Sequence, residues 1–588
     1  MKIFEANISY QAEVFLSESL KNITSFEIAN QKLSDVTGIT HFFENESDFV
    51  ELIQLISNTQ NSVAEEPDRA EYGDFQTNAN LANKATVHLS LKNVSPEIVI
   101  EPTCGKGSFI VASLSNFKGI KTIFGIEIYR PYVWETKFNI LDFFLSNKTC
   151  NKPEIVISHC NVFDFDFKKI ARQFAMQKIL VIGNPPWVTN SKLGSLNSAN
   201  LPKKSNFKKQ NGLDAMTGKG NFDIAEYITM MLFDAFHENT GHLSLLVKNS
   251  VIKNIVFDQK SKQYRIGEIE KHCIDSKKEF NASVEASLLY CRLNSAPGFE
   301  CREFDFYSTE SKLDFGWANS KFVSNISEYI ETSGIDGICP FEWRQGIKHD
   351  CSSVMELEKV NGHYVNNRSE EIFLEEDLVY GFLKSSDLKN TVIINTRKHT
   401  IVTQTKVGQE TAYIQHSFPK TYEYLIRNLS DFQSRKSSIY RGKPRFSIFG
   451  IGEYSFKPYK IAISGLYKTF HFTLVLPQNG KPVMLDDTCY FIGFDRIEFA
   501  VFAIILLNSK TTKEFLQSIT FSDSKRVFTK DLLMRIDFFK LVSIIPQEEI
   551  DEQIIRLNKK YDLKICLSSW ENFLQEIKPT AQQQLSMF

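Results

Sequence analysis

The sequence predicts an α/β fold with a mostly parallel sheet, followed by a second domain of the α+β class. Between about residues 70 and 300, short apolar runs alternate with helical stretches, a rhythm that builds βαβ units. After residue 330, aromatic and basic residues accompany short strand-like runs separated by Gly and Pro, which indicates a second domain. The runs expected to form strands of the first sheet are Glu97–Ile100, Thr122–Ile126, Glu154–Ile157, Ile179–Ile182, His242–Val247 and Ser287–Leu293.

Length and composition limit the classes of protein that fit. A chain of 588 residues is long enough for two or three domains. The net charge of −2 means that any nucleic-acid surface must come from locally clustered Lys and Arg. The ten cysteines include no CxxC pair, which argues against a disulfide framework and a structural zinc site and favours a reducing compartment. The N-terminus lacks the apolar core of a signal peptide, and the apolar run Phe499–Leu507 is too short to span a bilayer, so we expect a cytoplasmic protein with no membrane partner.

A glycine-containing turn marks a candidate cofactor site. The strand before Pro102 leads into Gly105 and Gly107 and then into a helical run, an arrangement that lets a ligand approach the backbone at a helix N-terminus. Such a pair of glycines alone is more often an ordinary tight turn. The next strand, however, ends in Glu127, 20 residues after Gly107, where dinucleotide-binding folds carry an acid that bonds ribose hydroxyls. The spacing predicts a nucleoside cofactor, and the missing third glycine counts against NAD.

A second turn carries the candidate catalytic residues, Asn184-Pro185-Pro186-Trp187. Two prolines directly after a buried strand force a rigid turn at the carboxyl end of that strand, where open α/β sheets bind their ligands. The Asn184 side-chain oxygen and the Pro185 carbonyl can both accept N–H bonds from an exocyclic amine, which aligns its nitrogen for attack on a methyl group. Trp187 can stack on the base. The alternative is a proline-rich turn capped by a core tryptophan.

These motifs resemble those of the adenine-N6 DNA methyltransferases that carry the NPP[FYW] signature, in the gamma order of motifs. The resemblance implies a Rossmann-like S-adenosylmethionine-dependent methyltransferase domain at residues 69–325, after an N-terminal helical segment at residues 1–68. Trp343–Asp350 and Phe446–Phe491 resemble the target-recognition domain of type II and type IIG restriction–modification methyltransferases. We therefore expect a DNA target-recognition domain at residues 326–578 and a C-terminal tail at residues 579–588.

The resemblance also assigns roles to residues. Tyr72–Asn78 matches the segment that holds the methionine end of the cofactor, and Phe280 would sandwich the extruded target base together with Trp187, unless it is an ordinary core aromatic. Asn161 stands where the family commonly has Asp against the cofactor adenine. The expected cofactor-binding residues are Thr77, Glu101, Pro102, Thr103, Cys104, Gly105, Gly107, Glu127, Asn161, Val162 and Asn184.

Two basic segments are candidates for DNA contact. Arg435–Lys468 holds eight basic residues and one acidic residue, a net charge of +7, with aromatic residues interleaved. The segment Val188–Gly220 holds six Lys and one Asp, a net charge of +5. Either could instead be a solvated surface. The residues expected to contact DNA are Lys203, Lys204, Arg344, Lys348, Arg435, Arg441, Lys443 and Arg445.

The sequence thus predicts a sequence-specific enzyme that methylates adenine N6 in double-stranded DNA after base flipping, in restriction–modification or phage defence, associated with the nucleoid. The cofactor is S-adenosylmethionine, and the chemistry needs no metal. Cytosine-N4 methylation and an inactive DNA-binding specificity subunit are the alternatives. A restriction endonuclease would be a separate chain. The C-terminal Gln584–Phe588 resembles the peptide that docks bacterial proteins on the sliding clamp, or else it packs on its own domain.

Overall fold

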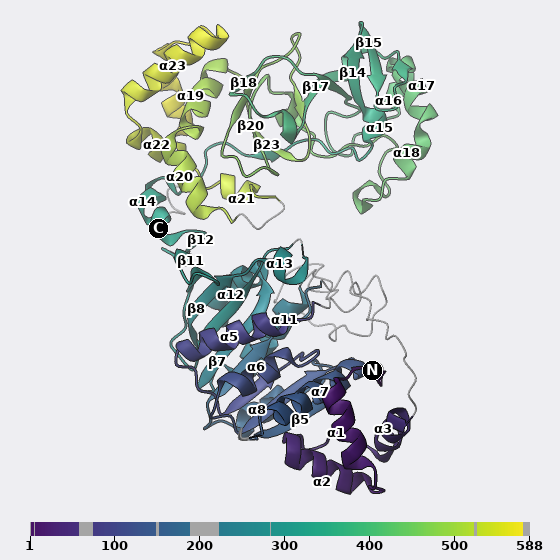
Figure 1. The fold of residues 1–588 in the computed structure, drawn as a ribbon. Coiled ribbons are helices and arrows are strands. Elements are labelled where there is room, and N and C mark those ends of the chain that lie inside the picture. Colours follow the sequence, from purple (N-terminus) through teal and green to yellow (C-terminus); the bar gives the residue numbers. More distant parts are fainter. Residues whose placement is uncertain are drawn as a thin grey trace. The chain divides into compact units, whose positions relative to one another are not determined.

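The structure is a computed structural model that describes residues 2–4, 6–57, 75–148, 152–188, 223–282, 284–521 and 526–579. The chain divides into two compact units, Met1–Phe322 and Val323–Phe588 (Figure 1). Several residues singled out from the sequence lie outside the described ranges. They are Lys203 and Lys204, the clamp-like segment Gln584–Phe588, most of Val188–Gly220, and Tyr72–Asp74.

The first unit is built on a ten-stranded sheet with the strand order β12-β11-β10-β8-β9-β7-β6-β3-β4-β5. The strands from β5 to β7 in this order run parallel, β9 runs antiparallel to both of its neighbours, and β10 runs parallel to β8. All six expected strands are confirmed, whereas β8 and β10 to β12 were not predicted. Their bounds are β3 Ile98–Glu101, β4 Thr122–Glu127, β5 Glu154–His159, β6 Ile179–Gly183, β7 Gly241–Lys248, β8 Ile266–Cys273, β9 Ala286–Leu293, β10 Glu300–Asp305, β11 Ser311–Ala318 and β12 Lys321–Val323.

Helices form two contacting groups around this sheet. Helices α5, α6 and α7 contact one another in series, and α8, α11 and α12 form a second series. Right-handed crossovers from β3 to β4 to β5 put the first group on one face, and the return of the chain through β6 and β7 puts the second group on the other. Their bounds are α5 Ala79–Leu91, α6 Ser108–Asn116, α7 Arg130–Ser146, α8 Phe167–Gln173, α11 Ile224–Phe236, α12 Asn249–Lys262 and α13 Ser276–Phe280.

The N-terminal helices belong to the same core as the sheet. Helices α1 (Tyr10–Leu20) and α2 (Phe26–Thr37) contact α7, and Ile39 forms a parallel bridge with Ile155 of β5. Phe42 and Phe43 are fully buried against Trp134 of α7, with ring centroids 6.1 Å from the tryptophan in both cases. Helix α3 (Glu46–Ser57) completes this group, which packs at the β5 edge of the sheet (Figure 1).

The second unit combines two mostly antiparallel sheets with helices, as expected for an α+β domain. The five-stranded sheet contains β13 Arg344–Gln345, β23 Cys489–Phe494, β20 Tyr459–Ser464, β21 Thr473–Val475 and β18 Val392–Ile393. The six-stranded sheet contains β16 Glu371–Ile372, β15 His363–Asn366, β14 Glu356–Val360, β19 Lys398–Ile401, β17 Val379–Leu383 and β22 Met484–Leu485.

The most apolar run of the chain forms the central helix of the second unit. Helix α19 (Ile497–Leu507) is buried from Ala500 onward and contacts β20, β21 and β23 on one side and the C-terminal helices on the other. No described helix is both long and apolar enough to cross a bilayer. The other helices of this unit are α14 Ile326–Thr332, α15 Ser352–Met355, α16 Tyr413–Ser417, α17 Pro419–Arg427, α18 Leu429–Gln433, α20 Lys510–Ile519, α21 Lys530–Leu533, α22 Phe538–Ile544, α23 Gln547–Tyr561 and α24 Trp570–Ile577.

Candidate active site

A cavity lies at the carboxyl edge of the first sheet, where the strand order reverses between β3 and β6. Ligands bind at such reversal points because the loops after the two strands diverge and leave a crevice. The cavity brings together segments that are far apart in the sequence: Phe75–Thr77, the ends of β3, β4 and β5, the turn after β6 and the start of α11. Of the residues expected to bind the cofactor or to act in catalysis, it is lined by Thr77, Glu101, Pro102, Thr103, Cys104, Gly105, Glu127, Asn161, Val162, Asn184, Pro185 and Pro186.

The glycine turn after β3 is shaped by close packing. Gly105 and Gly107 have positive φ values of 51° and 79°, which side chains rarely adopt. A Cβ atom on Gly105 would lie 2.5 Å from Gln76 Oε1, and one on Gly107 would lie 2.8 Å from Thr136 Cγ2. The Thr136 hydroxyl donates to the Gly105 carbonyl over 2.8 Å. Gly107 does not line the cavity; it lets α6 start directly behind the turn.

Glu127 ends β4 inside the cavity and is held by backbone donors. One carboxylate oxygen accepts the Gly105 N–H at 2.8 Å, and the other accepts the Tyr129 N–H at 2.7 Å. Each oxygen has further lone-pair capacity, so the carboxylate can accept hydroxyl groups in addition. Ile128, which follows, also lines the cavity and exposes 37% of its surface, an apolar face of the kind that suits a flat base.

Glu101 is a second acid in the same cavity, and only 2% of it is exposed. Its Oε2 atom has no hydrogen-bond partner among the residues that the structure describes. Burial, and then the nearby charge of Glu127, hold the pKa of Glu101 well above its ordinary value of 4.5. A cationic ligand group would satisfy this oxygen and favour its charged form.

Asn184 presents an unused acceptor to the cavity. Its Nδ2 donates to the Phe75 carbonyl at 2.7 Å and to Thr77 Oγ1 at 3.2 Å. Because a carbonyl can only accept, this bond fixes which end of the amide is the nitrogen. The Oδ1 atom is buried and has no partner within the described ranges. An acceptor held in this way suits the N–H groups of a substrate amine.

The aromatic residues expected to hold the target base contact one another. The Trp187 and Phe280 ring centroids are 5.0 Å apart at 68°, and Phe75 lies 5.1 Å from Trp187 and 6.3 Å from Phe280. Trp187 is 5% exposed and Phe280 7% exposed, and both belong to the hydrophobic core. A base between two rings needs about 7 Å, twice the usual van der Waals spacing. The sandwich therefore stays a prediction that requires these rings to separate.

Asn161 forms a local turn at the end of β5. Its Oδ1 accepts the Phe163 N–H at 3.0 Å, so any bond from a cofactor amino group would have to share that oxygen. Sequence reasoning gave no individual role to Gln76, Tyr129, Tyr132 or Phe163, which also line the cavity, although Gln76 lies within the expected cofactor segment Tyr72–Asn78. Tyr129 and Tyr132 lie at the start of α7, directly after Glu127. Their position next to the predicted ribose-binding acid could have identified them as cavity residues.

Three of the expected DNA contacts are free cations at the surface of the second unit. Arg441, Lys443 and Arg445 are exposed, and within the described part of the chain none of them pairs with a carboxylate. Arg344 pairs with Glu342, and Lys348 lies 3.3 Å from Asp350.

Arg435 is held by backbone carbonyls in this structure, and its expected contact with DNA stays a prediction. Its guanidinium donates to the carbonyls of Ser447 at 2.7 Å, Arg445 at 3.2 Å and His349 at 3.3 Å. It also stacks 3.7 Å from the Tyr440 ring centre. These bonds leave it little capacity for phosphate and close the loop that carries the three free cations. Lys460 of the same basic segment is buried, and burial lowers its pKa to about 7.

Comparison with known proteins decides the family. M.NspV, a type II methyltransferase of Nostoc sp. (strain ATCC 29411 / PCC 7524), is 38% identical over 488 residues, which cover 82% of this chain and 99% of that protein. The chain belongs to the family of type II methyltransferases. This type II methyltransferase is thus a DNA methyltransferase of the restriction–modification kind, and S-adenosylmethionine is its methyl donor. No family model matches the chain.

Among solved structures, the type IIL restriction–modification enzyme MmeI in complex with DNA has a TM-score of 0.53 to this methyltransferase at 13% identity. The match covers 99% of this chain and 92% of MmeI, and it confirms the expected fold. The type IIG restriction endonuclease BpuSI has a lower TM-score of 0.32 at 12% identity, covering 90% of this chain and 67% of that protein.

Proposed function

We propose that this methyltransferase transfers a methyl group from S-adenosylmethionine to adenine N6 in double-stranded DNA. The observation that carries the proposal is the buried Asn184 Oδ1, which has no partner among the described residues and belongs to a residue that lines the cavity together with Pro185. A rigid pair of acceptors next to a cofactor cavity suits an amine that must present its nitrogen to the methyl group.

The donor set of the cavity fits the cofactor. Glu127 offers carboxylate oxygens for the ribose hydroxyls, Ile128 and Val162 offer apolar surface to the adenine, and Glu101 offers a buried acid to the cationic amino-acid end. When bound, S-adenosylmethionine supplies a methyl group activated by a sulfonium centre.

Asn184 and Pro185 act on the target amine. The lone pair of an exocyclic amine is delocalised into its base, so the nitrogen is a weak nucleophile. When Asn184 Oδ1 and the Pro185 carbonyl accept its two N–H bonds, the nitrogen becomes pyramidal and its lone pair points at the methyl group. The Phe75 carbonyl and Thr77 hold the amide, so Asn184 need not reorganise as the N–C bond forms and the methyl–sulfur bond breaks, with its electron pair left on the sulfur as a neutral thioether. The surplus proton on the methylated nitrogen leaves to water.

Access to this site requires an extruded base, because the amine cannot reach the cavity within a duplex. The rings of Phe75, Trp187 and Phe280 contact one another in this structure, so base entry would part Trp187 from Phe280. Arg441, Lys443 and Arg445 would hold the phosphate backbone. A separate endonuclease and sliding-clamp docking through Gln584–Phe588 remain predictions.

The product identifies the base. The purified enzyme is incubated with methylation-free DNA and isotopically labelled S-adenosylmethionine, and the digested nucleosides are measured by mass spectrometry. N6-methyladenine is the expected product. N4-methylcytosine would support the cytosine alternative, since the same acceptors suit that amine. No labelled nucleoside would favour an inactive specificity subunit.

A further inference from the structure

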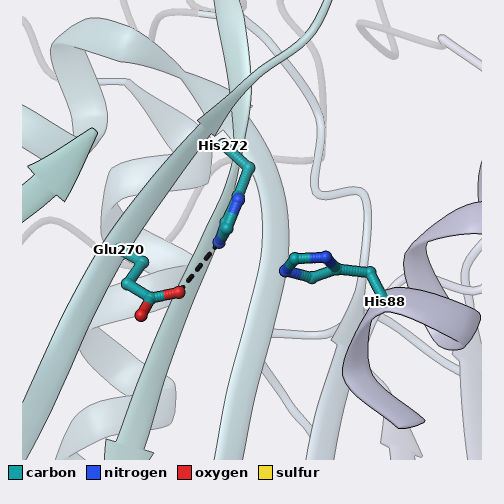
Figure 2. A group of neighbouring side chains, drawn as sticks. All are labelled: His88, Glu270 and His272. Carbon is teal, nitrogen blue, oxygen red and sulfur yellow. Dashed lines mark hydrogen bonds and ion pairs between the residues drawn. The ribbon is translucent and has the colours of Figure 1, made fainter. Parts of the chain in front are cut away.

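A second polar cluster of the first unit lies away from the cofactor cavity. Glu270 and His272 alternate along β8 and therefore point to the same face of the sheet, and His88 reaches them from α5 (Figure 2). His272 Nε2 lies 2.9 Å from Glu270 Oε2, and the His88 and His272 ring centroids are 4.4 Å apart. One ligand atom from each of the three residues lies within 4.8 Å of the other two.

The two histidines have unused nitrogens. His88 Nε2 and His272 Nδ1 are buried without a hydrogen-bond partner in the described part of the chain, and His272 is only 2% exposed. A buried polar atom without a partner lowers the stability of the folded state, so a ligand that satisfies it is favoured. Neutral imidazole binds a metal ion through a ring nitrogen that carries no proton.

We propose that His88, Glu270 and His272 form a binding site for one divalent transition-metal ion, with zinc as the best match. Two imidazoles and one carboxylate make a common set of three protein ligands for zinc, and water completes the tetrahedron. Ligand atoms about 2.0–2.1 Å from zinc stand about 3.3 Å apart, so the cluster must contract from its present span. His88 is half-buried and extends from a helix, so it can move toward the strand.

A resident cation competes for this site. Lys92 Nζ lies 2.7 Å from Glu270 Oε2, and Arg302 lies 2.8 Å from Glu270 Oε1. The Lys92 side chain is 28% exposed, so its ammonium can turn out to solvent and exchange with a metal ion. Arg302 can keep its bond to the other oxygen and orient the carboxylate, as outer partners of metal ligands do. Removing the Lys92 charge should therefore strengthen metal binding.

The site would join a helix to the sheet and take no part in methyl transfer. Helix α5 starts at Ala79, and its N-cap Asn78 directly follows Thr77 of the cofactor cavity, while His88 lies in the last turn of the helix. A metal held by α5 and β8 would fasten this helix at the end remote from the cavity. The expected effect is thermal stabilisation, because an ion that binds only the folded state shifts the unfolding equilibrium.

The test uses the full-length, untagged protein after chelation, with Cys566→Ser as the background because the Cys566 thiol is exposed and could bind zinc itself. Cobalt binding is followed by visible absorption, and zinc is followed by the shift in Tm. One ion per chain is expected, with a Kd below roughly 10 µM. No saturable binding up to roughly 100 µM would overturn the proposal.

Three variants make the test specific. His88→Gln should weaken binding at least about 100-fold, whereas His242→Gln, a change at another substantially buried histidine of the same sheet, should leave it unchanged. Equal affinity of His88→Gln and the background would contradict the proposal. Lys92→Met should bind more tightly than the background. If His88→Gln does not fold, this comparison decides, and an unchanged or weaker Lys92→Met affinity rejects the site.

Discussion

Replacing Asn184 with alanine tests the role of this residue in catalysis, with stability and cofactor affinity measured on the same variant. The change removes the free Oδ1 acceptor and the Nδ2 bond to the Phe75 carbonyl. Loss of one preorganised hydrogen bond to a reacting group lowers kcat by about 100- to 1,000-fold, or about 2.7–4 kcal/mol. The stranded Phe75 carbonyl costs about 1–3 kcal/mol of folding free energy. Affinity for S-adenosylmethionine should change by less than about threefold, well under 1 kcal/mol.

Asn239→Ala is the matched control. Its Nδ2 also donates to a buried carbonyl, that of Ala171 at 2.8 Å, but Asn239 does not line the cavity. Both variants should lose similar stability in urea unfolding, while only Asn184→Ala loses single-turnover methyl transfer to DNA. The reasoning fails if Asn184→Ala keeps more than about a tenth of the turnover. It fails equally if Asn239→Ala loses as much activity as Asn184→Ala.

Three further variants test the cofactor site and the DNA surface. Glu127→Ala should raise the Kd for S-adenosylmethionine roughly 10- to 150-fold in calorimetry, because hydrogen bonds to a carboxylate contribute about 1.5–3 kcal/mol. Glu101→Gln should change how stability depends on pH. Because folding raises the pKa of Glu101, the free energy of unfolding of the wild type falls as pH rises from 4.5 toward the raised pKa, whereas the variant lacks this fall. Urea unfolding at pH 5 and pH 8 measures the two free energies. The third variant replaces Arg441, Lys443 and Arg445 together with Glu. It should lower the slope of log affinity for DNA against log salt concentration by up to about 2.7.

Each of these variants has an outcome that contradicts its assignment. An unchanged cofactor affinity of Glu127→Ala would remove Glu127 from the ribose site. A stability difference between wild type and Glu101→Gln that is the same at both pH values would show that Glu101 titrates normally. The control for the DNA surface is the same charge reversal on Arg556, Lys559 and Lys560 of α23. An equal drop in slope from both triple variants would mean that net charge alone, and not the predicted surface, sets DNA affinity.

The sequence predicted the catalytic half of the sheet because its signals are local. Each strand from β3 to β7 is a short apolar run bounded by turn residues, and the glycine and proline turns mark the carboxyl ends of β3 and β6. Strands buried on both faces read as continuous apolar runs, which makes them recognisable. In contrast, β10 (Glu300–Asp305) and β11 (Ser311–Ala318) mix charged and apolar residues, so their pairing at the sheet edge could not be read from the sequence.

Contacts between residues that are far apart in the chain could not be predicted from the sequence. Arg435 resembles any other cation of a basic segment, and only the fold shows that its guanidinium donates to the carbonyls of Phe432 and Ser447, at the two ends of a loop. The sequence predicted a role for Trp187 and Phe280 at one base, whereas their direct ring contact depends on how β6 and α13 meet. The His88–Glu270–His272 cluster joins residues about 180 positions apart, so no short sequence motif could predict it.

Sequencing at single-base resolution of modified bases in host DNA tests the proposed function most directly. The enzyme and its Asn184→Ala variant are each expressed in a host that lacks DNA methyltransferases, and the genome is read for N6-methyladenine and N4-methylcytosine. We predict N6-methyladenine at one recurring sequence in the wild-type sample and its absence with the variant. N4-methylcytosine at a recurring sequence, or adenine methylation that persists with Asn184→Ala, would contradict the proposed function.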